Sequence, residues 1–209
     1  MEKLRSQAES CQGSTLSPIC LLVNPRALQF FFLVGTLIFL PAARLGGALS
    51  IGATYSLGFV DIDGNKHSTA DRHVTVIVLT TAADKDKART VGDRVPEHCL
   101  GNPDYRMITI IRFARKHTVI GRRIATTLIR HRVNEEARRL QAQYDGKGIK
   151  HDARKDIFVV TDFDGSVSSQ LGEAEGATDF CVFVFGRNGE LIAQWRGVPS
   201  AEQLAATVK

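Results

Sequence analysis

The sequence contains no C-x-x-C pair and no cysteine at zinc-ligand spacing from a histidine. Its four cysteines are Cys11, Cys20, Cys99 and Cys181, and the first two precede a hydrophobic segment. This spacing predicts neither a disulfide framework nor a structural zinc site. The 209 residues also include no G-x-S-x-G motif and no glycine-rich phosphate loop, so serine-hydrolase and nucleotide-binding functions have no support.

Metal ligation has equally little support. The segments 61–64 and 162–165 both read D-x-D-G, but a calcium loop needs glycine at its sixth position, where Lys66 and Val167 stand. We interpret both segments as tight turns. A second group of possible ligands fits no standard zinc spacing: His117, His131, Asp145, His151 and Asp152. We therefore expect no metal and no cofactor.

Positive charge is concentrated in one part of the chain. The net charge is +5, yet residues 112–155 contain 13 Lys and Arg against 4 Asp and Glu. Within them, residues 122–144 have the apolar spacing of a helix, with a stripe that includes Ile124, Leu128, Val133 and Tyr144. Six arginines of this helix form a candidate surface for an anionic partner: Arg122, Arg123, Arg130, Arg132, Arg138 and Arg139.

The nature of that partner depends on the compartment. Phospholipid head groups, an anionic envelope polymer or an acidic protein would suit an exported chain. Nucleic acid is disfavoured, because no aromatic residues alternate with these arginines. The alternative interpretation is a solvated helix face stabilised by its own Glu–Arg pairs.

A hydrophobic segment near the N-terminus predicts export. Residues 27–43 are uncharged and rich in Phe and Leu, and small residues follow at 46–48. We interpret 27–48 as a signal peptide cleaved before Leu49 or as a membrane anchor, with a buried soluble helix as the third possibility. The preceding residues 1–26 are an N-terminal extension that an upstream start site would explain. We expect the remaining chain in the periplasm, or anchored to the membrane and facing the exterior.

Strand and helix patterns alternate after residue 49. Because strands and helices alternate before a final hairpin and helix, the sequence predicts an α/β fold with a mixed sheet flanked by helices. Ser200 and Gln203 have the spacing of a capping box for the last helix. The expected strands are 59–62, 74–79, 105–113, 157–163, 179–185 and 191–195, and the expected helices are 84–95, 122–144 and 200–209.

Three stretches carry a resemblance to a known family. They are FVDIDGNKHSTADRHVTVIVL (59–79), VTDFDGSVSSQLG (160–172) and FVFGRNGELIAQWRGVPSAEQL (183–204). Together they resemble the redoxin branch of the thioredoxin-like superfamily, and the chain looks most like its exported YtfJ-type members, which lack the active-site cysteines. The resemblance implies a thioredoxin-like domain over residues 49–209, with an enlarged basic insertion at 114–155.

The resemblance also shows what the chain is missing. A redoxin has a reactive cysteine in the turn after the strand that corresponds to 74–79, at a helix N-terminus that lowers its pKa. It also has a cis-proline facing that cysteine, where this chain has Phe180. The resemblance therefore implies a degenerate groove without redox chemistry, formed by Thr80, Thr81, Ala82, Ala83, Asp84, Asp179 and Phe180.

Three functions remain open. The first is a non-catalytic binding or scaffold protein, which the loss of the redox residues favours. The second is a degenerate thiol oxidoreductase or peroxidase that uses Cys99 or Cys181. The third is a structural envelope component without a discrete ligand.

Overall fold

A five-stranded mixed sheet is the centre of the computed structural model, which describes residues 47–115, 117–174 and 176–208. The strand order is β5-β4-β3-β6-β7; β3 is parallel to β4, β4 is parallel to β5, and β6 is antiparallel to both β3 and β7. The predicted mixed sheet flanked by helices is thus confirmed. The bounds are β3 Val74–Thr81, β4 Tyr105–Arg112, β5 Ile157–Asp162, β6 Cys181–Phe185 and β7 Leu191–Arg196.

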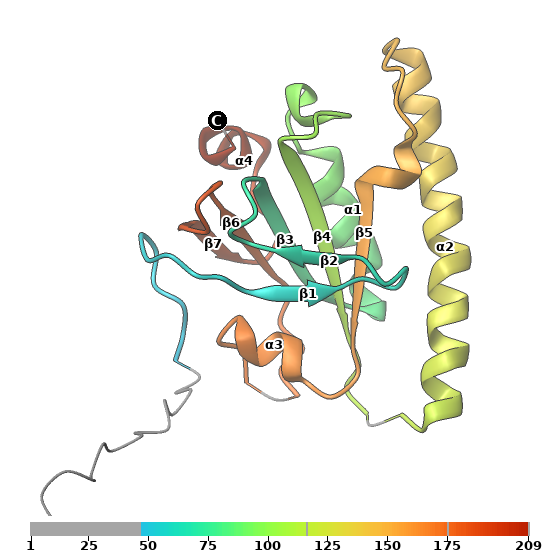
Figure 1. The fold of residues 1–209 in the computed structure, drawn as a ribbon, viewed down its shortest axis with the longest axis vertical. Helices are drawn as coiled ribbons and strands as arrows, with labels where there is room; N and C mark the ends of the chain where they lie inside the picture. The colour runs from blue at the N-terminus through green and yellow to red at the C-terminus, as the bar shows by residue number, and fades with distance from the viewer. Residues whose placement is uncertain (1–46, 116, 175, 209) are drawn as a thin grey trace, which may run out of the picture. The chain divides into compact units, whose positions relative to one another are not determined.

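The two faces of the sheet are covered by different elements (Figure 1). On one face, Ile77, Ile108 and Phe183 pack beneath the β1–β2 hairpin and beside α3. On the other, Val78 and Val182 belong to a cluster that includes residues of α1 and α4. The bounds of these elements are β1 Gly58–Val60, β2 Lys66–Ser68, α1 Lys85–Asp93, α3 Ser166–Gln170 and α4 Ala201–Thr207.

Short 3-10 turns and one long helix complete the described part. The turns are Ala82–Asp84, Glu97–Cys99 and Ala153–Asp156, and α2 extends over Val119–Gly146. The capping box of α4 is confirmed, because Ser200 and Gln203 bond each other's backbone amide through their side chains.

Among the described helices, even the 28-residue α2 lacks the apolar stretch that a bilayer-spanning helix requires. The predicted segments 1–26 and 27–48 lie outside the described residues, apart from Gly47 and Ala48, and stay predictions.

The apolar stripe predicted for α2 is only half buried. Val133 and Tyr144 are buried, but Ile124 and Leu128 are 58% and 61% exposed. The reason is length, because 28 helical residues span about 42 Å whereas the eight residues of β4 span about 26 Å. α2 is therefore longer than the strands of the sheet, and part of its N-terminal half, including Ile124 and Leu128, stays exposed.

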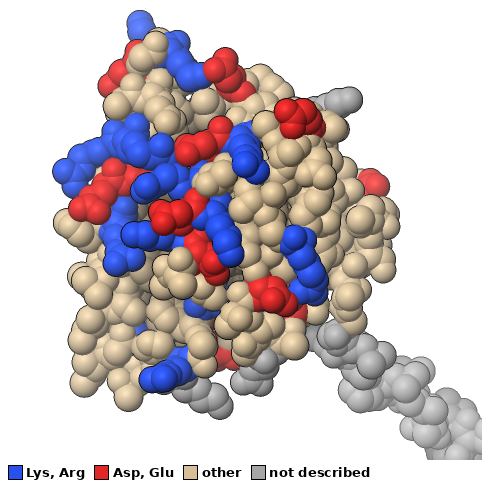
Figure 2. Space-filling model, turned by 180° about the vertical axis from the view of Figure 1, so that it is seen from behind, with Lys and Arg blue, Asp and Glu red and all other residues tan. Residues whose placement is uncertain are grey.

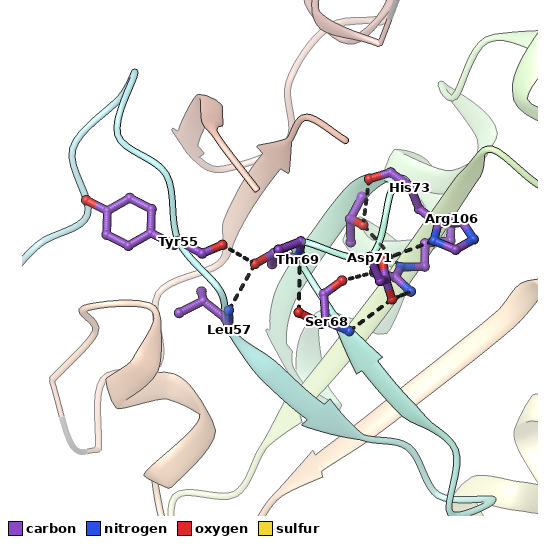
Figure 3. A network of polar contacts seen from close by, with 9 residues as sticks. Tyr55, Leu57, Ser68, Thr69, Asp71, His73 and Arg106 are labelled. Carbon is purple, nitrogen blue, oxygen red and sulfur yellow. Dashed lines mark hydrogen bonds and ion pairs between the residues drawn. The ribbon is translucent and has the colours of Figure 1, made fainter. Parts of the chain in front are cut away.

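A buried arginine fixes the β1–β2 hairpin over the sheet (Figure 3). Arg106, near the start of β4, donates to both carboxylate oxygens of Asp71 at 2.7 Å and to the Thr75 hydroxyl at 3.1 Å. It also donates to the carbonyl of Ser68 at the end of β2. Burial alone would raise the pKa of Asp71, but hydrogen bonds from Arg106 and His73 outweigh it and hold that pKa at about 2. The buried guanidinium is thus neutralised by the loop that follows the hairpin.

We expect Asp71→Asn to lower the free energy of unfolding by about 1–2 kcal/mol at pH 7, a figure reduced for the partial exposure of the carboxylate. The folded pKa lies below the ordinary value of 3.8, so the stabilisation is present above that value. It is lost as the pH falls through about 2. Urea unfolding at pH 7, 4, 3 and 2 measures the difference, with Asp86→Asn on the exposed surface of α1 as the control. A difference from wild type that stays constant down to pH 2 would contradict this account.

Candidate functional site

The turn after β3, where the resemblance to redoxins predicts the place of a reactive cysteine, contains the ion-paired carboxylate of Asp84. The Thr81 hydroxyl donates to Asp84 at 3.0 Å, and Lys87 pairs with the same carboxylate at 2.8 Å. The hydrogen bonds from Lys87 and Thr81 lower the pKa of Asp84. Asp84 immediately precedes α1, but its side chain accepts no backbone N–H and therefore does not cap this helix. The 3-10 turn that ends at Asp84 leaves its backbone outside the extended conformation that a cap needs.

The other side of the predicted groove contacts the same region. Phe180 is buried, and the Lys87 ammonium lies 6.0 Å from the centre of its ring. Asp179 pairs with Arg196 at 2.9 Å, and its backbone carbonyl accepts a hydrogen bond from Arg112. Lys87 and Arg112 thus connect the two predicted halves, while Thr80 is buried in β3. That these residues bind a ligand stays a prediction.

Both thiols of the described residues are buried. Cys99 is 8% exposed and Cys181 is fully buried at the start of β6. Burial raises the pKa of each thiol to about 11, and the carboxylate of Glu173, 3.6 Å from the Cys181 sulfur, adds to the effect there. Neither thiol therefore has the electropositive, accessible surroundings that make a cysteine nucleophilic.

The C-terminal end of β4 contains a charged residue that the sequence analysis did not select. Arg112 pairs in register with Thr81 on β3 and with Asp162 on β5, and it is only 7% exposed. Its Nη2 donates to the Asp179 carbonyl, but Nε and Nη1 are buried with no hydrogen-bond partner among the described residues. The alternating burial of β4 places Arg112 on the same face as Ile108 and Ile110. In the sequence, the even spacing of Arg112 from Ile108 and Ile110 was the signal that could have placed it on the buried face of this strand.

Arg112 lines a cavity of about 370 Å³ at the carboxyl ends of β3, β4 and β5. The stacked rings of Phe113 and Phe163, with centres 4.5 Å apart, form part of its wall. Asp162 also lines it, with its carboxylate accepting from the amide and hydroxyl groups of Ser168. Ligands of parallel-stranded sheets commonly bind at this end of the strands.

A larger groove lies between α1 and α2 above β4. Its volume is about 1140 Å³, and its lining includes the apolar side chains of Val76, Met107 and Val133. Two ion pairs connect the helices beside it, Arg89 with Glu136 at 2.8 Å and Arg139 with Asp93 at 3.1 Å. Residues 80–82 and Cys99 also reach this groove.

The six arginines of α2 are not one uniform free surface. Figure 2 shows basic and acidic side chains interleaved over this side of the molecule. Arg130 donates to the Ile62 carbonyl, and Arg139 pairs with Glu136 at 2.6 Å. Arg122 lies over the ring of Phe163 at 5.4 Å. These contacts favour the locally paired helix face, with three exposed arginines left on it: Arg123, Arg132 and Arg138.

Comparison with known proteins gives a distant likeness only. No protein-family model matches the chain, and no curated protein matches it. The chain is similar to solved structures of dsbF from MTB (15% identity, 76% of this chain and 97% of that one, TM-score 0.47). It is also similar to an exposed lipoprotein thioredoxin from Streptococcus pneumoniae strain TIGR4 (12% identity, 74% of this chain and 98% of that one, TM-score 0.44). A further similar structure is a peroxiredoxin-like protein from Aquifex aeolicus (12% identity, 77% of this chain and 88% of that one, TM-score 0.43). Likeness at this level assigns no activity or ligand to this chain.

We expect Cys99 and Cys181 to react with a thiol reagent at pH 8 at least about 100-fold more slowly than the same thiols in the unfolded chain. A pKa near 11 instead of 9.0 reduces the thiolate fraction by that factor before access is considered. The measurement follows release of the chromophore of a disulfide reagent, with Cys11 and Cys20 changed to Ser and with the chain in guanidinium chloride as the control. Equal rates for folded and unfolded chains would contradict the burial of these thiols.

Proposed function

We propose that this chain is a thioredoxin-like binding protein without thiol redox chemistry, and that its ligand site lies at the carboxyl ends of β3, β4 and β5. The observation that carries the proposal is the turn at 81–84, where Asp84 is held by Lys87 and Thr81 at the position of a redoxin thiol. The likeness to YtfJ-type proteins, which also lack the cysteines, is part of this proposal.

The chemistry of the turn supports binding rather than electron transfer. A redoxin needs a thiolate that forms and breaks a bond to sulfur or oxygen, and the start of a helix stabilises that thiolate. A carboxylate such as that of Asp84 cannot undergo this two-electron exchange. What remains at these strand ends is a set of hydrogen-bonding groups beside a cavity, which is sufficient for recognition.

The proposal extends to location and partners. We propose that the chain is exported, with residues 27–48 as a cleaved leader or as a membrane tether, and that it meets a protein or an anionic envelope component. The exposed arginines of α2, Arg123, Arg132 and Arg138, offer a second contact surface for that partner. Like the partner itself, this surface is an inference from charge.

The alternative function is a thiol oxidoreductase. One observation favours it: Cys181 directly follows Phe180 of the predicted groove in the chain, although the two side chains belong to clusters on opposite faces of the sheet. For this thiol to react, β6 would have to open locally, because the side chain is fully buried and its pKa is raised to about 11. The two functions differ in whether turnover requires a thiol.

An assay of peroxide consumption and of disulfide reduction separates them. In a chain with Cys11 and Cys20 changed to Ser, we expect no turnover, either with Cys99 and Cys181 present or with both changed to Ser. As a positive control, Asp84→Cys in the thiol-free chain should consume about one equivalent of peroxide, because it restores a thiol at the start of α1. Turnover that disappears when Cys99 and Cys181 are replaced would overturn the proposal.

A further inference from the structure

We propose that the cavity lined by Arg112 binds a small ligand through a singly charged carboxylate, which neutralises the Arg112 guanidinium. The inference rests on the proposed function, because it names the ligand class of the site at the ends of β3, β4 and β5. It is carried by Arg112 itself, which is 7% exposed and has two nitrogens buried without a hydrogen-bond partner among the described residues.

Burial of an unneutralised guanidinium is costly. Removing a charged group from water costs several kcal/mol unless an opposite charge and further hydrogen bonds replace the lost hydration. Arg106, on the same face of the same strand, receives that compensation from Asp71, Thr75 and Ser68. Arg112 donates one hydrogen bond, to the Asp179 carbonyl; its charge contributes to lowering the pKa of Asp84, but no carboxylate of the described residues lies within ion-pair distance of it.

The carboxylate nearest in the strand register forms no ion pair with Arg112. Asp162 is opposite Arg112 on β5, but its oxygens accept from the backbone amides of Val167 and Ser168 and from the Ser168 hydroxyl. These bonds hold the start of α3 against the end of β5. Arg112 therefore lies beside a carboxylate that is already engaged, at the edge of a cavity with room for another.

The cavity also limits the charge and shape of the ligand. The lining contains the guanidinium groups of Arg112 and of the exposed Arg115 together with the carboxylates of Asp162 and Asp164, and these two carboxylates would repel a dianion more strongly than a monoanion. A guanidinium suits a carboxylate, whose two oxygens can accept from neighbouring N–H groups of the fork. The rings of Phe113 and Phe163 provide an apolar wall for the remainder of the ligand. A flat aromatic or aliphatic monocarboxylate meets these conditions better than inorganic phosphate.

Calorimetric titration of the full chain with benzoate tests the proposal. We expect saturable binding to the wild-type chain, and at least about tenfold weaker binding to Arg112→Met, because the charge-assisted hydrogen bonds are removed. Lys66→Gln removes one positive charge from the exposed side of β2 and should leave the affinity unchanged. Benzamide, the neutral analogue, and inorganic phosphate should bind at least about tenfold more weakly than benzoate. Absence of saturable benzoate binding, or equal affinity of wild type and Arg112→Met, would overturn the proposal.

Thermal unfolding without ligand is a second readout. Because Arg112→Met removes an uncompensated buried charge, we expect a midpoint equal to or higher than that of the wild type, and only the wild type should gain stability from benzoate. A variant that unfolds at a clearly lower temperature would show that Arg112 already has its counter-charge inside the protein. The redox assay tests the proposed function independently of benzoate binding. Thiol-dependent turnover would refute the proposed function. A protein that shows no turnover and does not bind benzoate would refute the ligand class alone.

Discussion

Two arginines buried at opposite ends of β4 impose the constraint on which the rest of this structure depends. β4 lies between β3 and β5, and Arg106 and Arg112 occupy the face that also buries Ile108 and Ile110. Water cannot hydrate either guanidinium fully, so each needs acceptors from its surroundings. At the first end, the loop after β2 supplies Asp71 and fixes the hairpin over the sheet. At the second end the described residues supply one acceptor, the backbone carbonyl of Asp179, and a cavity adjoins Arg112.

This asymmetry separates the structural end of the sheet from its candidate binding end. At the carboxyl ends of the strands the chain places the ion-paired Asp84, the cavity beside Arg112 and the inaccessible thiol of Cys181, whereas the buried Cys99 precedes the start of β4. Nucleophilic sulfur chemistry needs an exposed thiolate, whereas recognition of an anion needs a desolvated, positively charged donor. The described residues provide a desolvated, positively charged donor in Arg112 but no exposed thiol. The proposed binding function and the proposed ligand class both rest on this combination of a buried arginine and inaccessible thiols.

The sequence predicted the sheet and its flanking helices because apolar strands and capped helices leave local patterns, such as the capping box at Ser200 and Gln203. It overestimated the buried stripe of α2 at Ile124 and Leu128, because periodicity shows which side of a helix is apolar but not whether a neighbour is long enough to cover it. Arg112 was counted only as part of the basic segment. Its role depends on strand register and on the acceptors around it, and both are tertiary properties that a linear pattern does not contain.

The most direct test of this account is a crystal structure of the chain grown with benzoate. We expect a benzoate carboxylate in the cavity at the ends of β3, β4 and β5, with its oxygens at about 2.8 Å from guanidinium nitrogens of Arg112 and its ring against Phe113 and Phe163. A carboxylate of the protein itself in that position, closing the cavity and pairing with Arg112, would contradict it. In that case the arginine would be a second structural anchor like Arg106, and the ligand site would have to lie elsewhere.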